Sequence, residues 1–194
     1  MDLDNQSHPS TAERLRTGIH AVDTTGAPVR YRYLQPSDDI DALTRLLHRA
    51  YAPLAAAGMQ FLASHQDAAV TRRRADEGET IVAEDGATIV GTITVVSAAA
   101  TGGSPFYDRP DVASVGQFAV EPALQGRGIG RMLLQFAEQR ATEQGVGTLA
   151  LDTSEHATEL IARYERWGFR FVEHARWSVV NYRSVVMAKP LKQT

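Results

Sequence analysis

The chain has 194 residues, no cysteine, a formal net charge of -3 and a pI near 6.1. This length fits one domain with its own core, and the lack of cysteine excludes disulfides, thiolate metal ligands and a cysteine nucleophile. The weak negative charge gives no general attraction to nucleic acid or to anionic membranes, so we expect neither as a partner.

The first 28 residues are mostly small and polar with little periodicity, which predicts a mobile N-terminal extension around a short helix near residues 12–16. The domain itself is expected over residues 29–194. The polar first 20 residues predict no signal peptide, and no apolar stretch in the sequence is long enough to cross a bilayer. We therefore expect a cytoplasmic protein.

Apolar periodicity and end signals predict seven strands and four helices. Asp85-Gly86 between two β-branched runs is a strong signal for an antiparallel hairpin. The element order predicts one mixed sheet with helices on its faces, a domain of the α/β or α+β class. In chain order we expect a strand at 31–34, helices at 40–53 and 67–78, strands at 80–84, 88–96 and 112–120, a helix at 128–144, a strand at 148–152, a helix at 154–168, and strands at 169–177 and 182–188.

The most informative stretch lies between the strand at 112–120 and the following helix, where residues 125–130 read Gln-Gly-Arg-Gly-Ile-Gly. Glycines let bare backbone N–H groups approach an anion, and the helix that follows adds the positive end of its dipole. The stretch therefore predicts a phosphate site, although a glycine-rich turn can also serve only to reverse the chain.

Two common phosphate signatures fail at nameable residues. A nucleotide triphosphatase loop needs Lys and Ser or Thr after its last glycine, whereas Arg131 and Met132 follow Gly130. A dinucleotide fingerprint starting at Gly126 would need its third glycine at Arg131. Asp152 follows the glycines at about the sequence spacing of the acid that binds ribose in such folds, and without the fingerprint this spacing is a coincidence.

The stretch does match the pattern Gln/Arg-x-x-Gly-x-Gly/Ala, at Gln125, Gly128 and Gly130, after Phe-Ala-Val-Glu-Pro at residues 118–122. This resembles the pyrophosphate-binding motif of the GCN5-related N-acetyltransferase (GNAT) superfamily, which uses acetyl coenzyme A (acetyl-CoA). Residues 164–169 resemble the family's Tyr-x-x-x-Gly-Phe ending. The resemblance covers residues 29–189 and implies a largely antiparallel mixed sheet with splayed central strands.

The resemblance also implies which residues hold the coenzyme. Backbone groups of Phe118 and Val120 would pair with the pantetheine arm as if it were a strand, because the strand at 112–120 splays from the next one. Amides of the glycine stretch would hold the pyrophosphate, with Arg127 and Arg131 either adding charge or lying solvated at the helix start. The implied coenzyme-binding residues are Phe118, Val120, Gln125, Gly126, Arg127, Gly128, Ile129, Gly130 and Arg131.

The resemblance implies that Tyr164 is the catalytic acid, although its spacing alone would also fit an ordinary core aromatic. Acyl transfer from a thioester expels a thiolate, and a phenol near that sulfur can protonate it. No base is assigned, because the family's usual positions correspond here to Ser114 and Gly116. More remote candidates are Glu84, Asp108 and His65.

Two further positions bear on the site. The family often places Asn seven residues before the tyrosine to contact the cofactor, and this position is Ala157, beside His156.

Three arginines at residues 72–74 are followed by acidic residues, which is typical of a solvated helix face. The six histidines show no metal-ligand spacing, so we expect no metal.

The sequence thus predicts an N-acetyltransferase that moves an acetyl group from acetyl-CoA to a primary amine by direct attack. Phe61, His65, Trp177 and Tyr182 are candidates to line the acceptor site, or ordinary core residues. The acceptor is a small-molecule amine or a peptide or protein amine. The sequence leaves the oligomeric state open, and a homodimer is one possibility. Alternatives are a non-catalytic acyl-CoA-binding or regulatory domain and a dinucleotide-dependent enzyme.

Overall fold

The structure is a computed structural model that describes residues 9–97 and 104–192. Its centre is an eight-stranded sheet in the order β1-β2-β3-β4-β5-β6-β8-β7, antiparallel throughout except between β5 and β6. The strands are β1 (Ile19–Val22), β2 (Pro28–Tyr33), β3 (Glu79–Asp85), β4 (Thr88–Val96), β5 (Val112–Val120), β6 (Thr148–Ser154), β7 (Arg170–Arg176) and β8 (Arg183–Pro190).

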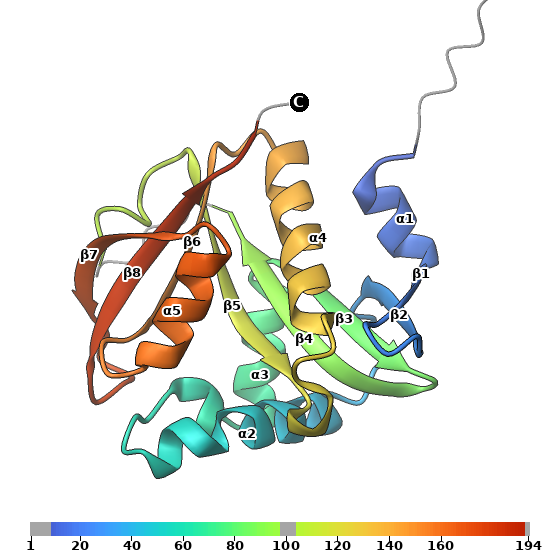
Figure 1. Cartoon of the computed structure of the whole chain (residues 1–194), viewed down its shortest axis with the longest axis horizontal. Coiled ribbons are helices and arrows are strands. Elements are labelled where there is room, and N and C mark those ends of the chain that lie inside the picture. The colour runs from blue at the N-terminus through green and yellow to red at the C-terminus, as the bar shows by residue number, and fades with distance from the viewer. Residues whose placement is uncertain (1–8, 98–103, 193–194) are drawn as a thin grey trace, which may run out of the picture.

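Five α-helices cover the two faces of this sheet (Figure 1). Helices α4 and α5 lie on one face, where α1 packs beside α4, and α2 and α3 lie on the other face. None of the helices in the described ranges is long and apolar enough to cross a membrane. The helices are α1 (Thr11–Thr17), α2 (Ile40–Ala56), α3 (Ala68–Asp76), α4 (Ile129–Glu143) and α5 (Thr158–Arg166), with short 3₁₀ turns at Leu62–Ser64 and Pro122–Leu124.

The larger core lies under α4. Leu133, Leu134 and Ala137 of that helix are fully buried against β-branched and aromatic residues of the central strands. Alternation along each strand sends successive side chains to opposite faces. In β6, Leu149 and Leu151 therefore join this core, whereas Ala150 belongs to a smaller cluster on the opposite face.

Local signals explain where the predicted elements begin and turn. The carboxylate of Asp39 accepts from the backbone amide of Ala42 at the start of α2, and Asp67 caps α3 in the same way. The Asp85-Gly86 hairpin forms as expected, with Gly86 at a φ of 60°. Helix α5 begins later than the expected start at residue 154, because its N-cap is Ala157, which supplies no side-chain hydrogen bond.

The N-terminal segment also differs from the expected mobile extension, because residues 9–28 fold onto the domain. Leu15 of α1 has no exposed surface, and the backbone amide of Thr11 donates to Glu143 of α4 at 2.6 Å. Strand β1 pairs antiparallel with β2 and extends the sheet. Four residues with alternating burial were too short a pattern to predict this strand from sequence.

Candidate active site

The candidate site lies where β5 and β6 separate. The two strands pair only between Val112–Ser114 and Thr148–Ala150, and no strand of the described ranges pairs with the rest of that β5 edge. The β4–β5 register shifts between Thr92 and Thr94, which places a bulge in β5. Gln117 in this bulge has a φ of 47°, the only positive φ outside glycine in the described chain. This geometry confirms the expected splayed strands.

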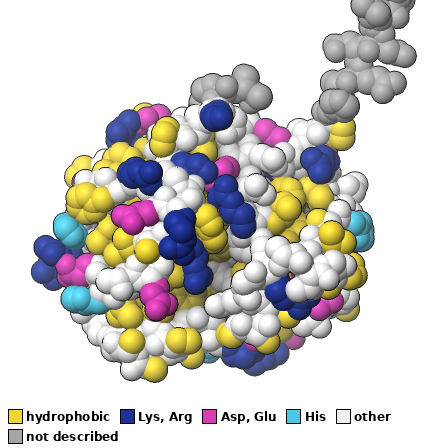
Figure 2. Space-filling view, viewed as in Figure 1, with side chains coloured by type: hydrophobic (Ala, Val, Ile, Leu, Met, Phe, Trp, Pro, Cys, Tyr) yellow, Lys and Arg dark blue, Asp and Glu magenta, His cyan; other side chains and the backbone are white. Residues whose placement is uncertain are grey.

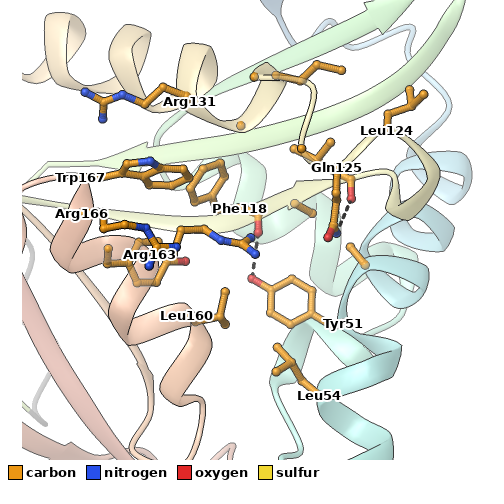
Figure 3. A pocket seen from close by; sticks show the side chains of 18 residues that line it. Tyr51, Leu54, Phe118, Leu124, Gln125, Arg131, Leu160, Arg163, Arg166 and Trp167 are labelled. Carbon is orange, nitrogen blue, oxygen red and sulfur yellow. Dashed lines mark hydrogen bonds between the residues drawn. The ribbon is translucent and has the colours of Figure 1, made fainter. Parts of the chain in front are cut away.

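A cavity of about 380 Å³ occupies the opening (Figure 3). It runs from the glycine stretch, past the exposed edge of β5, to the facing side of α5. Its lining comes from α2, β5, the glycine stretch with the start of α4, and α5, and consists of Ala50, Tyr51, Leu54, Phe118, Ala119, Val120, Leu124, Gln125, Gly126, Gly128, Ile129, Gly130, Arg131, Leu160, Arg163, Tyr164, Arg166 and Trp167.

The glycine stretch presents unused backbone donors to this cavity. Gly126 and Gly128 have φ values of 82° and 84°, and Gly128 is the N-cap of α4 without a side-chain cap. The amides of residues 126–131 donate to no acceptor in the described chain. A Cβ on Gly130 would lie 3.4 Å from Val120, so a bare backbone keeps the groove open. Unsatisfied amides at a helix N-terminus suit a pyrophosphate.

Three arginines add positive charge around the same cavity. Arg163 and Arg166 on α5 form no ion pair with a described residue, and Figure 3 shows Arg163 directed across the opening toward Tyr51. Arg131 lies over the Trp167 ring at 5.9 Å, and its buried Nη1 has no hydrogen-bond partner in the described chain, although it lies 3.8 Å from the carboxylate of Glu138. Figure 2 shows Lys and Arg side chains gathered over α4 and α5 on this face. This donor set fits the phosphates of a coenzyme A.

Three of the residues expected to bind the coenzyme use their side chains elsewhere. The Arg127 guanidinium pairs with the buried carboxylate of Asp23 in the β1–β2 turn. The Ile129 side chain is buried in the core. The Gln125 amide donates to the Val120 carbonyl at 3.3 Å. Gln125 and Ile129 therefore offer the cavity mainly backbone groups, and Arg127 is not part of its lining.

The Phe118 carbonyl, expected to face the pantetheine arm, already accepts a hydrogen bond from Tyr51 of α2 at 3.1 Å. The Phe118 ring lies 6.2 Å from the ring of Trp167 at the end of α5, so these two side chains face each other across the splayed strands. Burial raises the pKa of Tyr51 to about 12, which keeps this hydroxyl protonated. Tyr51 is a site residue that the sequence did not indicate, because it follows the apolar spacing of α2.

Tyr164, the candidate acid, lines the cavity from α5. Its ring packs edge-on against Trp167 and Phe169 at centroid distances of 6.0 and 6.1 Å. Its hydroxyl has no hydrogen-bond partner among the described residues. Burial raises the pKa of Tyr164, so the phenol carries its proton at neutral pH. A protonated, unengaged hydroxyl beside the opening can donate to a leaving thiolate.

Three of the four expected acceptor-site residues gather on the α2 and α3 side of the sheet. The rings of Tyr51, Phe61 and Tyr182 form a chain with centroid distances of 5.3 and 4.8 Å. Trp177 donates from its indole nitrogen to Asp152 at 3.0 Å. His65 is exposed and lines a separate cavity of about 360 Å³, formed with Gln60 and residues 178–181.

Two charged residues that were not predicted to belong to the site, Arg74 and Asp152, also lie on this side of the sheet. Arg74, assigned to a solvated face, points inward and donates to Gln66 at 2.6 Å. Asp152, dismissed as a coincidence, is partly buried on β6. The signals were present: Arg74 shares a helix face with buried Thr71 and Ala75, and Asp152 follows an apolar strand.

Glu84 and Asp108, the remaining candidate bases, are not part of the cavity lining. Glu84 on β3 is buried and pairs with Arg32 and with the more exposed Arg30, both on β2. Asp108 is exposed, as is His156 before α5. Among residues 9–97 and 104–192, no group of three or more His, Asp or Glu side chains could hold a metal ion.

The comparisons with known proteins agree with this geometry. A sequence model described as Acetyltransferase (GNAT) family matches residues 40–169. The chain is 32% identical over 145 residues to the S-(2-succino)cysteine N-acetyltransferase of Bacillus subtilis (strain 168), covering 72% of this chain and 83% of that protein.

Solved structures share the fold. The GNAT domain of S. lividans PAT aligns with a TM-score of 0.69 at 20% identity, over 95% of this chain and 100% of that chain. A GNAT family acetyltransferase from Elizabethkingia anophelis with acetyl-CoA bound aligns with a TM-score of 0.60 at 15% identity, over 84% and 98%. The chain therefore belongs to the GNAT acetyltransferase family, whose members transfer an acetyl group from acetyl-CoA to an amine.

Proposed function

We propose that this N-acetyltransferase acts on a primary amine of a small molecule, and that S-(2-succino)cysteine is the first acceptor to test. The observation that carries this proposal is the 32% identity to an enzyme named for that acceptor, over 83% of its length. The aromatic chain of Tyr51, Phe61 and Tyr182 beside the opening supports it, because it offers a compact apolar wall for one small acceptor.

On the donor side, the amides of residues 126–131 and the dipole of α4 hold the pyrophosphate. Arg131, Arg163 and Arg166 supply charge to the coenzyme phosphates. The open edge of β5 gives the pantetheine arm a strand to lie along. Backbone amides near Phe118 polarise the thioester carbonyl, in the manner of an oxyanion hole.

On the acceptor side, the neutral amine attacks the thioester carbonyl directly. The nitrogen lone pair forms the new C–N bond, the C–S bond breaks, and the sulfur takes the proton of the Tyr164 hydroxyl. The amine loses one proton, and Tyr164 is reprotonated after the thiol leaves. No covalent enzyme intermediate is involved.

The test is an amine panel with acetyl-CoA and a free-thiol readout. The panel contains S-(2-succino)cysteine, other cysteine S-conjugates, a polyamine and a peptide with an N-terminal alanine. We expect thiol release to be fastest with a cysteine S-conjugate. Faster release with the peptide would contradict the small-molecule proposal, and coenzyme binding without release on any amine would favour a non-catalytic acyl-CoA-binding domain.

A further inference from the structure

On the face of the sheet opposite α4 and α5, two charged side chains lie beside the splayed strands without a direct ion-pair partner among the described residues. Arg74 of α3 and Asp152 of β6 lie on the α2 and α3 side of the sheet, and neither has an oppositely charged group within 4.0 Å among the described residues. By contrast, the buried arginines Arg32 and Arg140 each pair with a carboxylate.

The place of Arg74 is fixed by a buried amide. Its Nη1 donates to Oε1 of Gln66 at 2.6 Å, and Gln66 in turn donates to Gln117 in the β5 bulge. Its Nη2 lies 3.5 Å from the position that a Cβ on Gly116 would occupy. The other guanidinium N–H groups donate to no described residue, yet none of these nitrogens is sealed from solvent.

Asp152 is held by neutral donors only. Its carboxylate accepts from Tyr107 at 3.2 Å, Trp177 at 3.0 Å and Ser184 at 2.8 Å. A carboxylate has about four acceptor positions, so one remains for another donor. None of these three partners neutralises its charge.

The strand register places the two residues together. Ser114 pairs with Ala150, so Gly116 and Asp152 are the next residues on the same face of β5 and β6, at the level where the strands separate. Arg74 covers Gly116. The guanidinium of Arg74, which reaches β5 from α3, and the carboxylate of Asp152 on β6 therefore lie on the same face of the sheet where the strands separate, more than 4.0 Å apart.

Partly buried charges without partners are costly, and such groups mark binding sites more often than other residues do. Burial raises the pKa of Asp152 and lowers that of Arg74, and the charge of each residue offsets only part of the shift in the other, because the two groups are not in direct contact. Direct pairing would relieve both. The structure instead holds them apart, one through Gln66 and the other through Tyr107, Trp177 and Ser184.

We infer that Arg74 and Asp152 together bind the two charges of an α-amino acid acceptor, the guanidinium taking its carboxylate and Asp152 facing its amine. This inference rests on the proposed function and narrows its substrate class. A zwitterion supplies the missing counter-charge to both residues at once, whereas a simple amine would leave Arg74 unpaired. The acceptor side chain would then lie along the aromatic wall of Phe61 and Tyr182.

The test compares acceptors that differ only at the carboxylate: S-methylcysteine, its α-carboxamide and S-methylcysteamine. We expect wild-type kcat/KM to be at least about tenfold higher for S-methylcysteine than for S-methylcysteamine. Arg74→Met should reduce this ratio by about tenfold to a hundredfold, the size of a lost hydrogen bond to a charged group. Arg73→Met, an exposed neighbour on the same helix, should leave the ratio unchanged. Asp152→Asn should lower kcat/KM for both acceptors and keep the ratio.

The ratio of kcat/KM values for two acceptors in one preparation does not depend on the folded fraction of the protein. A variant that folds poorly can therefore still be compared with the wild type. Arg74→Lys is a second test, because lysine keeps the positive charge but lacks the planar guanidinium that can bind a carboxylate through two hydrogen bonds. The ratio should fall less in Arg74→Lys than in Arg74→Met. Equal use of both acceptors by the wild type, or an unchanged ratio in Arg74→Met, overturns the inference alone. No transfer to any amine of the panel overturns the proposed function as well.

Discussion

The side-chain nitrogen of Gln66 donates to Oε1 of Gln117 at 2.9 Å, which ties the α2–α3 connection to the residue with left-handed backbone in β5. A second bond from the same nitrogen reaches Thr71 at 2.7 Å, and the Gln66 oxygen accepts from Arg74. The bulge that opens the sheet and the arginine beside it are thus held by one buried amide.

Gln66→Leu tests this relationship. Leucine has a similar volume but leaves Oε1 of Gln117 and Nη1 of Arg74 without the side-chain partner that each has in the wild type. We expect a loss of about 2 to 4 kcal/mol in the free energy of unfolding, since each unsatisfied buried group costs about 1–3 kcal/mol. Urea denaturation measures it. A change within about 0.5 kcal/mol, the range of ordinary surface substitutions, would mean that the amide is not a structural tie.

Tyr164→Phe should lower kcat by about a hundredfold or more, because a positioned acid contributes typically 10²–10⁴-fold. Affinity for acetyl-CoA should change little, since the missing hydroxyl serves the leaving group. Tyr33→Phe is the matched control, because the Tyr33 hydroxyl bonds Glu79 on β3, outside the cavity lining. Thiol release in steady state measures both variants, and full turnover in a folded Tyr164→Phe preparation would exclude the acid role.

Gly130→Ala should separate stability from coenzyme binding. Alanine at this helical position can add up to about 1 kcal/mol of helix stability. The new methyl group would lie 3.4 Å from Val120 and 3.7 Å from Phe118, so it fits without a clash but narrows the groove. We expect a higher melting temperature without ligand and a smaller increase when coenzyme A is added. A larger ligand-induced increase would place the coenzyme elsewhere.

Gly128→Glu is the stronger test of the phosphate site. Gly128 has a φ of 84°, and a side chain there would press on Thr24 while bringing a negative charge to the helix N-terminus. Coenzyme affinity should fall by at least about tenfold, as measured by calorimetry on protein shown to be folded by circular dichroism. Retained affinity in such a preparation would rule out the site.

Asp23→Asn should change how stability depends on pH. Hydrogen bonds from Thr25, Ala27 and Arg127 lower the pKa of Asp23 from 3.8 to about 2. A lowered folded-state pKa stabilises the protein above the unfolded value, and this contribution is lost as pH falls from about 4 to about 2. The variant should therefore melt several degrees below the wild type at pH 7, with the gap closing in that acidic window. Glu77→Gln, at an exposed residue, should show no such gap.

Much of the fold could be predicted because its signals are local. The Asp85-Gly86 turn, the cap of α3 and the glycine stretch each require particular residues at particular positions, and the structure places hairpin, helix and loop there. The family resemblance drew attention to Tyr164 as the candidate acid, and this residue is part of the cavity lining.

The residues that escaped prediction depend on tertiary contacts. Three consecutive arginines look alike in sequence, and only the packing of α3 on the sheet decides that Arg74 turns inward while Arg73 stays exposed. The bulge carries Gln117 where glycine would be the usual signal, because buried side-chain bonds hold its positive φ. Tyr51 follows helical spacing like any core residue.

The Asp23–Arg127 pair means that the region recognisable as a GNAT domain and the unit that folds have different boundaries. A chain trimmed to residues 40–169 would keep the glycine stretch but lose the turn that anchors Arg127, along with β8, the partner of β6. Anyone fusing or transplanting this enzyme should carry residues 9–192 as one piece.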